Sequence, residues 1–422
     1  MNRAIGTIII SWTLLLAGIP SPGVAQTGDF ALGTLLQRAL EHNPELKAAE
    51  YRWQLYENKV PQAGVLADPS LSFGLSNYPV DSWAGNESPM SGKLVKLSQS
   101  LPFPGKLSTV KEKSKQQALW FKGVYEDEKL QLAWKVKDAY YSLFFFDRAL
   151  KITQKNLALL DDFVRLTETN YEIGKGLLQD VLKAQVAHSR LIDRTYSYNK
   201  QYARALADLN SLTDQQLDFP DSDLPELEPV VLAATAEELH QTFEKNRPLY
   251  SSYLALIEQN RLQKKLARLD FRPDFKLGAS YTFREPNPAD GGTDFSGIEV
   301  GIDIPLHLGK RKAAVAEAES GINMAERQLD NFRNLARLNI QDSVLKIRQS
   351  EKQVELYRSG LIPQSRQTFE AALSGYQVGK IDFLALLDSI MTVYDYELEY
   401  YRVMLDGRRG LARLEAEIGA VL

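Results

Sequence analysis

The chain has 422 residues, no cysteine and a formal net charge of −4 at pH 7, from 50 basic and 54 acidic residues. Without cysteine the chain can form no disulfide and can carry no lipid on a thiol. The nearly balanced charge argues against a nucleic-acid partner. Beyond the first 25 residues, no stretch approaches the roughly 18 uninterrupted apolar residues of a spanning helix, which excludes a helical membrane protein.

Residues 1–25 are predicted to be a secretory signal peptide. Arg3 precedes an apolar stretch at residues 8–19, and the small residues Gly23 and Ala25 suit cleavage by a signal peptidase. The alternative is an uncleaved anchor, but a spanning helix needs about twenty apolar residues and this stretch has only about a dozen. We therefore expect a secreted chain.

The second half of the chain repeats the first at an offset of about 203 to 205 residues. Solenoid units run to only about 20–50 residues, so this period indicates two copies of one large unit. We assign residues 26–212 to a first structural repeat, 213–234 to a linker and 235–422 to a second repeat. The paired landmarks, in order, are Asn43-Pro44-Glu45-Leu46 with Asn246-Arg247-Pro248-Leu249, Asp68-Pro69 with Arg272-Pro273, Leu101-Pro102 with Ile304-Pro305, and Tyr171-Glu172-Ile173-Gly174-Lys175 with Tyr376-Gln377-Val378-Gly379-Lys380.

The unit is predicted to begin with a helix and to continue into two strands. In the first copy the helical segment covers residues 29–67 and is broken at Asn43-Pro44, because proline suits the first turn of a helix. Turn-forming and polar residues fill the loops between the strands. The expected strands and loops are strand 70–78, loop 79–89 and strand 93–101, then strand 274–284, loop 285–292 and strand 296–304.

Alternation of apolar and polar residues is clearest in the second pair of strands. This pattern gives each strand one apolar and one wet face, and strands of about ten residues match those of a tilted transmembrane barrel. Alternation alone also allows a hairpin packed on a soluble core. The apolar positions are Phe275, Leu277, Ala279, Tyr281 and Phe283, then Ile298, Val300, Ile302 and Ile304.

Two very long helices are predicted to follow the strands. Residues 107–171 contain no proline and carry a heptad repeat of apolar residues, which is typical of coiled-coil packing. At about 1.5 Å per residue this helix is about 100 Å long. Gly174-Lys175-Gly176 then ends it, and a return helix is expected at 177–212. The seam positions of the first long helix are Leu132, Val136, Ala139, Leu143, Phe146, Leu150, Thr153, Leu157, Leu160 and Val164.

The second copy predicts the same pair of helices, at residues 310–376 and 382–417. Pro363 falls inside the first of them and should kink the helix or restart it. The fold class is therefore mixed and mainly α, built from a repeated helix–strand–strand–helix–helix unit. Because four strands cannot close a barrel and an open sheet edge is not viable in lipid, we expect a cyclic trimer with a twelve-stranded barrel and a cylinder of long helices.

These features resemble the TolC-like trimeric outer-membrane efflux channels of Gram-negative bacteria. Besides the doubled unit, the resemblance lies in residues 99–106, Gln-Ser-Leu-Pro-Phe-Pro-Gly-Lys, and in Leu361-Ile362-Pro363-Gln364 leading to residues 376–388. It implies a passive exit duct in the outer membrane that extends into the periplasm. The implied partners are two further copies of the chain, outer-membrane lipid, a periplasmic adaptor and an inner-membrane pump.

The run Leu-Pro-Phe-Pro-Gly-Lys at residues 101–106 is most similar to the branch of this family that works with heavy-metal exporters of the resistance–nodulation–division class. The resemblance to that branch implies that heavy-metal cations are the exported substrate.

The resemblance also implies a gate at the inner mouth. The family closes this end with an Asp-x-x-Asp pattern after the second Tyr-x-x-Gly turn, and here the pattern falls on Ala385 and Asp388. The equivalent places in the first repeat hold Asp180 and Lys183, so that Asp388, Asp180 and Lys183 are the candidate gate, with a possible salt bridge from Lys183 to Asp388. The alternative is that all three are ordinary solvated charges. The turns before them contain Tyr171 and Gly174, and Tyr376 and Gly379.

No catalytic or metal-binding pattern is present in the sequence. The four histidines are scattered without paired spacing, and neither a phosphate-binding loop nor a nucleophile elbow occurs. We therefore expect neither enzyme activity nor a cofactor or bound metal. Two alternatives to a channel are a soluble periplasmic coiled-coil scaffold, in which the hairpins cap a helical bundle, and an adaptor, which the twofold repeat disfavours.

Overall fold

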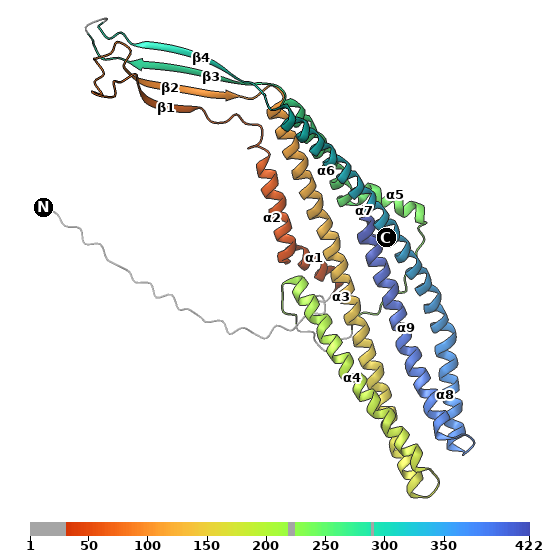
Figure 1. Ribbon diagram of the computed structural model, residues 1–422. Coiled ribbons are helices and arrows are strands. Elements are labelled where there is room, and N and C mark those ends of the chain that lie inside the picture. Colours follow the sequence, from red (N-terminus) through yellow and green to blue (C-terminus); the bar gives the residue numbers. More distant parts are fainter. Residues whose placement is uncertain (1–30, 218–223, 288–290) are drawn as a thin grey trace, which may run out of the picture.

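The computed structural model describes residues 31–217, 224–287 and 291–422. The expected signal peptide at residues 1–25 lies outside the described residues. Figure 1 shows a long rod of helices with a four-stranded sheet at one end and two helical hairpin tips at the other. The fold is thus mixed and mainly α, as the sequence predicts.

The described elements follow the same order in each half of the chain. The first half contains α1 (Leu32–His42), α2 (Pro44–Lys59), β1 (Ser70–Ser76), β2 (Gly92–Leu101), α3 (Lys106–Glu172) and α4 (Leu178–Thr213). The second half contains α5 (Ala236–Asn246), α6 (Pro248–Leu269), β3 (Asp274–Phe283), β4 (Phe295–Asp303), α7 (Leu308–Leu356), a π-helical segment (Tyr357–Leu361), α8 (Ile362–Gln377) and α9 (Phe383–Ile418).

The break between α1 and α2 lies where the sequence predicts it. The Asn43 side chain caps α2 by accepting a hydrogen bond from the Leu46 N–H at 3.0 Å, and Pro44 occupies the first turn. The predicted end at residue 67 is wrong, however, because α2 stops at Lys59. Pro61 causes the stop, since it has no N–H with which to continue the helix.

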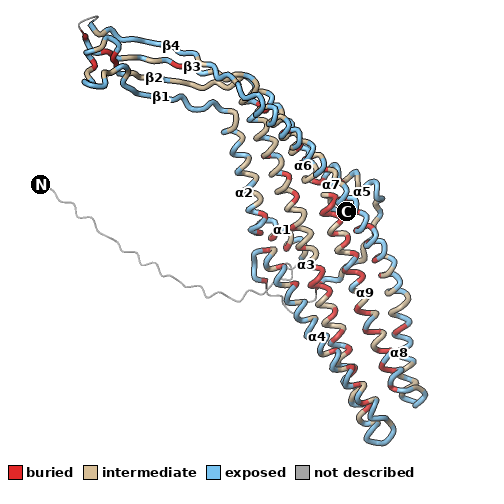
Figure 2. The backbone as a smooth tube through the Cα atoms, viewed as in Figure 1, coloured by how far each residue is buried: buried red, intermediate tan, exposed pale blue. Residues whose placement is uncertain are grey.

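The sheet has the order β1-β2-β3-β4, and each pair is antiparallel. Strands β2 and β3 come from different repeats, so the sheet joins the two halves of the chain. Its register places Leu97 beside Ala279 and Ala279 beside Ile298, which aligns the apolar residues on one face. Figure 2 shows that most of the sheet is exposed or only half-buried within one chain.

The joint between β2 and α3 is formed by the Leu-Pro-Phe-Pro-Gly-Lys run. The Phe103 N–H donates to Asp274 Oδ1 at 2.7 Å, and Lys106 Nζ lies 3.0 Å from the same carboxylate. Lys106 also pairs with Asp270 at 3.2 Å. The run therefore fixes the angle between the sheet and the helical rod.

Helix α3 is uninterrupted for 67 residues and packs against α4, α6 and α9. In the lower half of α3 the predicted seam residues Thr153 and Leu160 are buried. The predicted positions Phe146, Leu150, Leu157 and Val164 are only half-buried, and the neighbouring Ala149, Asn156 and Phe163 are buried instead. Polar residues enter the seam because they bond back to the carbonyl four residues earlier. The donors are Thr153 to Ala149 at 2.6 Å, Asn156 to Ile152 at 2.8 Å and Thr167 to Phe163 at 3.0 Å.

The prediction of an interruption at Pro363 is confirmed. Helix α7 ends at Leu356, the segment Tyr357–Leu361 is π-helical, and α8 restarts with Pro363 in its first turn. A proline in the first turn of a helix is tolerated because the N–H groups of that turn have no partner within the helix. The π-helical segment before it shifts the hydrogen-bonding pattern so that α8 can begin at this point.

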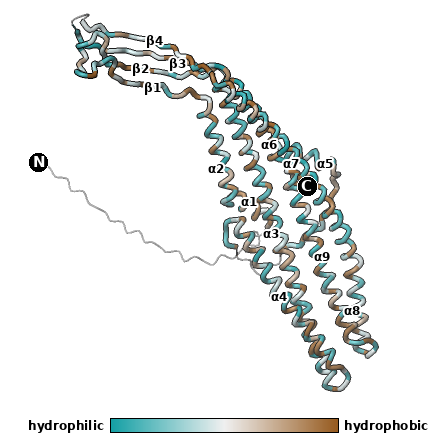
Figure 3. The backbone as a smooth tube through the Cα atoms, in the orientation of Figure 1, coloured by the Kyte–Doolittle hydropathy of each residue, from teal (hydrophilic) through white to brown (hydrophobic). Residues whose placement is uncertain are grey.

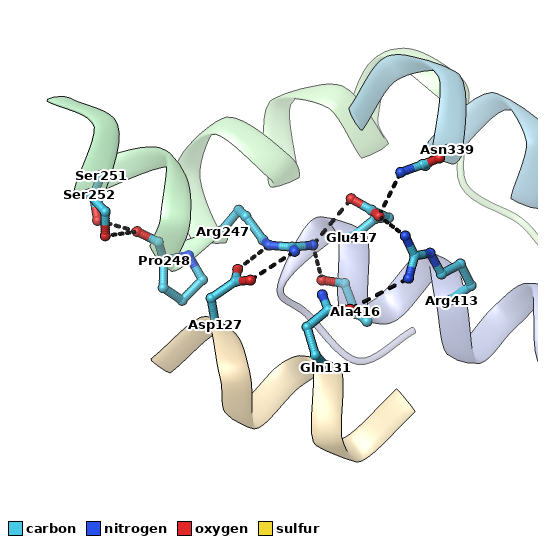
Figure 4. A network of polar contacts seen from close by, with 10 residues as sticks. All are labelled: Asp127, Gln131, Arg247, Pro248, Ser251, Ser252, Asn339, Arg413, Ala416 and Glu417. Carbon is cyan, nitrogen blue, oxygen red and sulfur yellow. Dashed lines mark hydrogen bonds and ion pairs between the residues drawn. The ribbon is translucent and has the colours of Figure 1, made fainter. Parts of the chain in front are cut away.

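A buried ionic cluster joins helices α3, α7 and α9 to the junction between α5 and α6 (Figure 4). Arg247, between α5 and α6, binds both carboxylate oxygens of Asp127 on α3, with Nη2 to Oδ2 at 3.1 Å. Its Nη1 donates to the Ala416 carbonyl and lies 3.2 Å from Glu417 Oε2 on α9. We call this cluster, which is completed by Asn339 of α7 and Arg413 of α9 on Glu417, the buried joint.

Candidate functional site

The two hairpin tips have the same backbone geometry. Gly174 and Gly379 both adopt φ +72, a left-handed conformation that glycine accepts at little cost. In both tips this glycine N–H donates to the carbonyl of Tyr171 or Tyr376 at 3.0 Å, and the following N–H donates to the residue before the tyrosine at 2.8 Å. The four turn residues named from the sequence therefore build two matching helix ends.

The two tyrosines have different surroundings. Tyr376 is half-buried, accepts a hydrogen bond from Asn170 Nδ2 at 3.2 Å and packs edge-on against Phe383 at 5.8 Å. Tyr171 remains 47% exposed. Tyr376 thus connects the second tip to Asn170 of the first tip, whereas Tyr171 is largely exposed within one chain.

A groove of about 770 Å³ runs between α4 and α9 just above the tips. Its walls combine apolar side chains with charges of both signs, and we call it the tip groove. Figure 3 shows hydrophobic residues gathered along the lower ends of α3 and α4. The apolar lining residues include Leu178, Leu182, Val186, Leu384, Leu387 and Met391. The charged lining residues are Lys183, Arg190 and Arg194 on α4 and Asp388 and Asp395 on α9.

The charges on the two walls are opposite at equivalent positions. Adding 205 to Lys183 gives Asp388, and adding 205 to Arg190 gives Asp395. Of the two carboxylates on α9, Asp395 forms an ion pair across the groove, because its Oδ1 lies 3.2 Å from Arg194 Nη1. In the part of the chain that the structure describes, no ion pair joins Lys183 to Asp388, although both line the groove.

The third predicted gate residue lies apart from this pair. Asp180 is in the first turn of α4, where the helix dipole favours a carboxylate, and it is half-buried outside the groove lining. The structure thus brings Lys183 and Asp388 to one groove and leaves Asp180 outside its lining. Sequence reasoning missed Arg190, Arg194 and Asp395. The 205-residue offset that linked Lys183 to Asp388 would have found the pair Arg190 and Asp395.

Hydroxyl groups hold the helices together above the groove. Burial, together with a hydrogen bond to Tyr394, raises the pKa of Tyr198 on α4 to about 12. The hydroxyl groups of Tyr394 and Thr153 are 3.1 Å apart and form a hydrogen bond between α9 and α3. Tyr198 stays protonated at any physiological pH, so this connection between α4, α9 and α3 does not depend on pH.

Other candidate chemistry has little support among the described residues. No group of three histidine, aspartate or glutamate side chains within ranges 31–217, 224–287 and 291–422 is arranged to hold a metal ion. His188 instead lies 2.9 Å from Asp161 and links α4 to α3. Of the helices described, none is long and apolar enough to span a membrane.

The rod of paired helices, attached to a sheet with one apolar and one polar face, has the architecture of an outer-membrane channel with a periplasmic helical barrel. A family model described as "Outer membrane efflux protein" matches residues 35–214 and 239–420. The chain therefore belongs to the outer membrane efflux protein family.

Curated relatives agree with this assignment. The chain is 23% identical over 382 residues to the probable efflux pump outer membrane protein TtgC of Pseudomonas putida, across 86% of this chain and 77% of the relative. The antibiotic efflux pump outer membrane protein ArpC of Pseudomonas putida matches to the same extent.

Solved structures show the same fold. The outer membrane protein VceC of Vibrio cholerae superposes with a TM-score of 0.78 at 17% identity, covering 92% of this chain and 96% of VceC. The channel protein CusC gives 0.79 at 16% identity, covering 92% of each chain.

Family membership places this chain in the outer membrane, with an extension into the periplasm, as a channel component and not an enzyme. Members of the family are trimeric channels that work with an adaptor and an inner-membrane pump. The soluble scaffold and the adaptor are accordingly set aside.

Proposed function

We propose that three copies of this chain form the exit duct of a tripartite efflux system. Strands β1 and β4 are the open edges of the sheet. Their unpaired backbone N–H and C=O groups would find no water to bind in the hydrocarbon of a membrane. Since successive strands alternate in direction, β4 of one copy can pair with β1 of the next in the same antiparallel pattern. Three copies then close twelve strands, with the apolar face toward outer-membrane lipid.

The exposed apolar stripe of α4 is the observation that carries this proposal. Leu178, Leu182 and Val186 are 51%, 53% and 52% exposed within one chain. The residues 205 positions later, on α9, are Phe383, Leu387 and Met391.

On α9, Phe383 of this stripe packs against α3, and the centres of the Phe383 and Phe163 rings are 6.2 Å apart. Because α7 and α8 are the counterpart of α3, the stripe of α4 should pack on α7 and α8 of a neighbouring copy. Residues 26–212 and 235–422 would then alternate around one cylinder.

The duct itself is passive. Its periplasmic end would meet an adaptor and an inner-membrane pump, and the pump would supply the energy for transport. We propose heavy-metal cations as the exported substrate, on the strength of the resemblance at residues 101–106. That run forms the β2–α3 joint, so what it supports is the branch of the family.

A second substrate class is favoured by the names of the relatives, which include an antibiotic and a toluene efflux protein. Deleting the gene and measuring growth inhibition by heavy-metal salts, toluene and antibiotics decides between the classes. The heavy-metal proposal expects sensitivity to metal salts that the intact gene restores. Sensitivity to toluene and antibiotics alone would replace it, and unchanged tolerance to all of them would count against an efflux role.

We further propose that the inner mouth is closed by Asp388, Asp180 and Lys183, assisted by the upper pair Arg190 and Asp395. If α4 and α9 alternate around the threefold axis, positive and negative walls alternate as well. Each exposed pair contributes only about 0–1 kcal/mol, so the mouth could open without unfolding a helix.

A further inference from the structure

The polar face of the sheet carries two ion pairs. Lys96 Nζ of β2 lies 2.5 Å from Glu299 Oε2 of β4, and Lys276 Nζ of β3 lies 2.9 Å from Asp303 Oδ1 of β4. Their side chains are between 32% and 63% exposed, so all four remain hydrated. The two carboxylates are four residues apart on β4, which separates the pairs by about 13 Å along the strand.

Glycines on the same face make room for the longer pair. Glu299 is flanked on this face of β4 by Gly297 and Gly301, and it stands beside Gly278 in the register. A Cβ atom at Gly278 would lie 3.5 Å from both Lys96 Cε and Glu299 Cβ. Lys96 therefore passes over β3 at a position without a side chain and reaches a partner two strands away.

The other residues on this face are mainly small and uncharged. Between the two pairs, the cross-strand neighbours are serine and glycine, as in Ser98 beside Gly278 and Ser280 beside Gly297. The two pairs thus lie on a hydrated surface that is otherwise mostly serine, threonine and glycine. At the end of the sheet the same face also carries Asp274, which stands beside Asp303 in the register and is paired with Lys106 at 3.0 Å.

We infer that these two pairs set the charge selectivity of the barrel exit, as two rings in which each lysine is matched by a carboxylate. This inference rests on the proposed trimeric barrel, in which the polar face lines the lumen. Three copies would place six lysines and six carboxylates there. Rings of charged side chains select ions by sign, and balanced rings leave the exit open to cargo of either sign.

Removing one sign of charge should therefore make the exit selective. In E299Q/D303N six lysines lose their partners and the lumen becomes positive, whereas in K96Q/K276Q it becomes negative. Salt should screen the field of a ring only partly at a neighbouring lumen residue. The Debye length is about 8 Å at physiological ionic strength, and this is comparable with the distance between them.

The absence of cysteine from the chain allows a direct measurement of the potential in the lumen. Ser280→Cys places a thiol beside Lys96 in the register. Whole cells are treated from outside with a negatively or a positively charged methanethiosulfonate reagent, and the ratio of the two labelling rates is compared among variants. We expect E299Q/D303N to shift this ratio about tenfold toward the anionic reagent, and K96Q/K276Q to shift it toward the cationic reagent.

Two controls accompany this measurement. Glu285→Gln removes a carboxylate that pairs with Lys93 at 3.1 Å, and Lys93 belongs to the apolar face, so this variant should leave the ratio unchanged. The variant with all four charges neutralised should restore the original ratio. If E299Q/D303N does not insert into the membrane, the single E299Q and the K96Q/K276Q variants provide the same test.

The outcomes separate this inference from the proposed function. If Ser280→Cys reacts but the ratio is the same in all variants, the charge rings are wrong and the barrel stands. If Ser280→Cys is unreactive while Val300→Cys on the apolar face reacts with both reagents, the proposed barrel is wrong, and the inference fails with it.

Discussion

The buried joint and the tip groove both bring opposite charges together, but they do so in different surroundings. At the buried joint, the side chains of Arg247 and Glu417 are only 4% and 5% exposed. At the tip groove, the paired side chains of Arg194 and Asp395 are 43% and 58% exposed. Buried charges must keep their partners, whereas hydrated charges can exchange them for water. The buried joint is thus built to stay fixed, and the tips are built so that they can rearrange.

Breaking the buried joint should have the largest effect. Arg247→Met leaves the Asp127 and Glu417 carboxylates without their cation and should cost about 3–5 kcal/mol of folding stability. Denaturant unfolding measures this loss. Arg261→Met is the matched control, because Arg261 is 57% exposed and its pairs with Glu258 and Glu326 should each contribute about 0–1 kcal/mol. Equal losses in the two variants would show that the joint carries no special stability.

Aromatic packing, and not charge, should hold the second tip to the rod. Phe383 is 1% exposed and contacts Phe163 and Tyr376, so Phe383→Ala should cost about 3–5 kcal/mol. Its counterpart Leu178 is exposed within one chain, so Leu178→Ala should leave the folded subunit intact and weaken the association of subunits. Thermal unfolding and the detergent concentration that dissociates the oligomer separate the two effects. A Leu178→Ala variant that loses helical content before it dissociates would contradict this difference.

In the proposed barrel the two faces of the sheet differ in the same way, because the apolar face contacts lipid and the polar face contacts water in the lumen. Val300 lies on the apolar face, and Val300→Arg should cost about 2–4 kcal/mol at the bilayer midplane. Ser280→Arg, on the polar face, should be tolerated. The yield of assembled protein in outer membranes compares the two variants. Equal yields would show that the sheet faces have been assigned the wrong way round.

The smallest energetic effect should come from the tip charges, although their effect on conduction should be large. Asp180→Ala combined with Asp388→Ala should change stability by no more than about 1 kcal/mol and should raise single-channel conductance in planar bilayers. Block by divalent cations should weaken, because clustered carboxylates would no longer hold a cation. Glu317→Ala, far up α7, should do neither. If conductance and block stay the same in the double variant, the gate assignment is wrong and the duct remains.

Local chemistry explains which parts of the fold could be predicted from the sequence. The break at Asn43-Pro44, the restart at Pro363 and the strands to within one or two residues of their ends depend on neighbouring residues only. Thr153 and Leu160 are buried on the seam of α3 as predicted, but Asn156 is buried in place of the predicted Leu157, because its side chain bonds back to the Ile152 carbonyl and it behaves as a core residue. Hydropathy does not show this behaviour.

The buried joint could not be predicted, since Arg247 reaches Asp127 and Glu417 across 120 and 170 residues. At the tip groove, the repeat offset was enough to identify Lys183 and Asp388 as equivalent positions, which both line the groove without an ion pair between them among the described residues. The distance between their helices is a tertiary property and required the structure. The proposed partner of the exposed stripe on α4 is a neighbouring copy, so it could not be predicted from the fold of a single chain.

The mass of the folded protein in mild detergent tests the central claim most directly. Our account predicts a single species with three times the mass of the chain, because four strands and the stripe of Leu178, Leu182 and Val186 are incomplete without neighbours. A monodisperse monomer that keeps its full helical content would contradict the account.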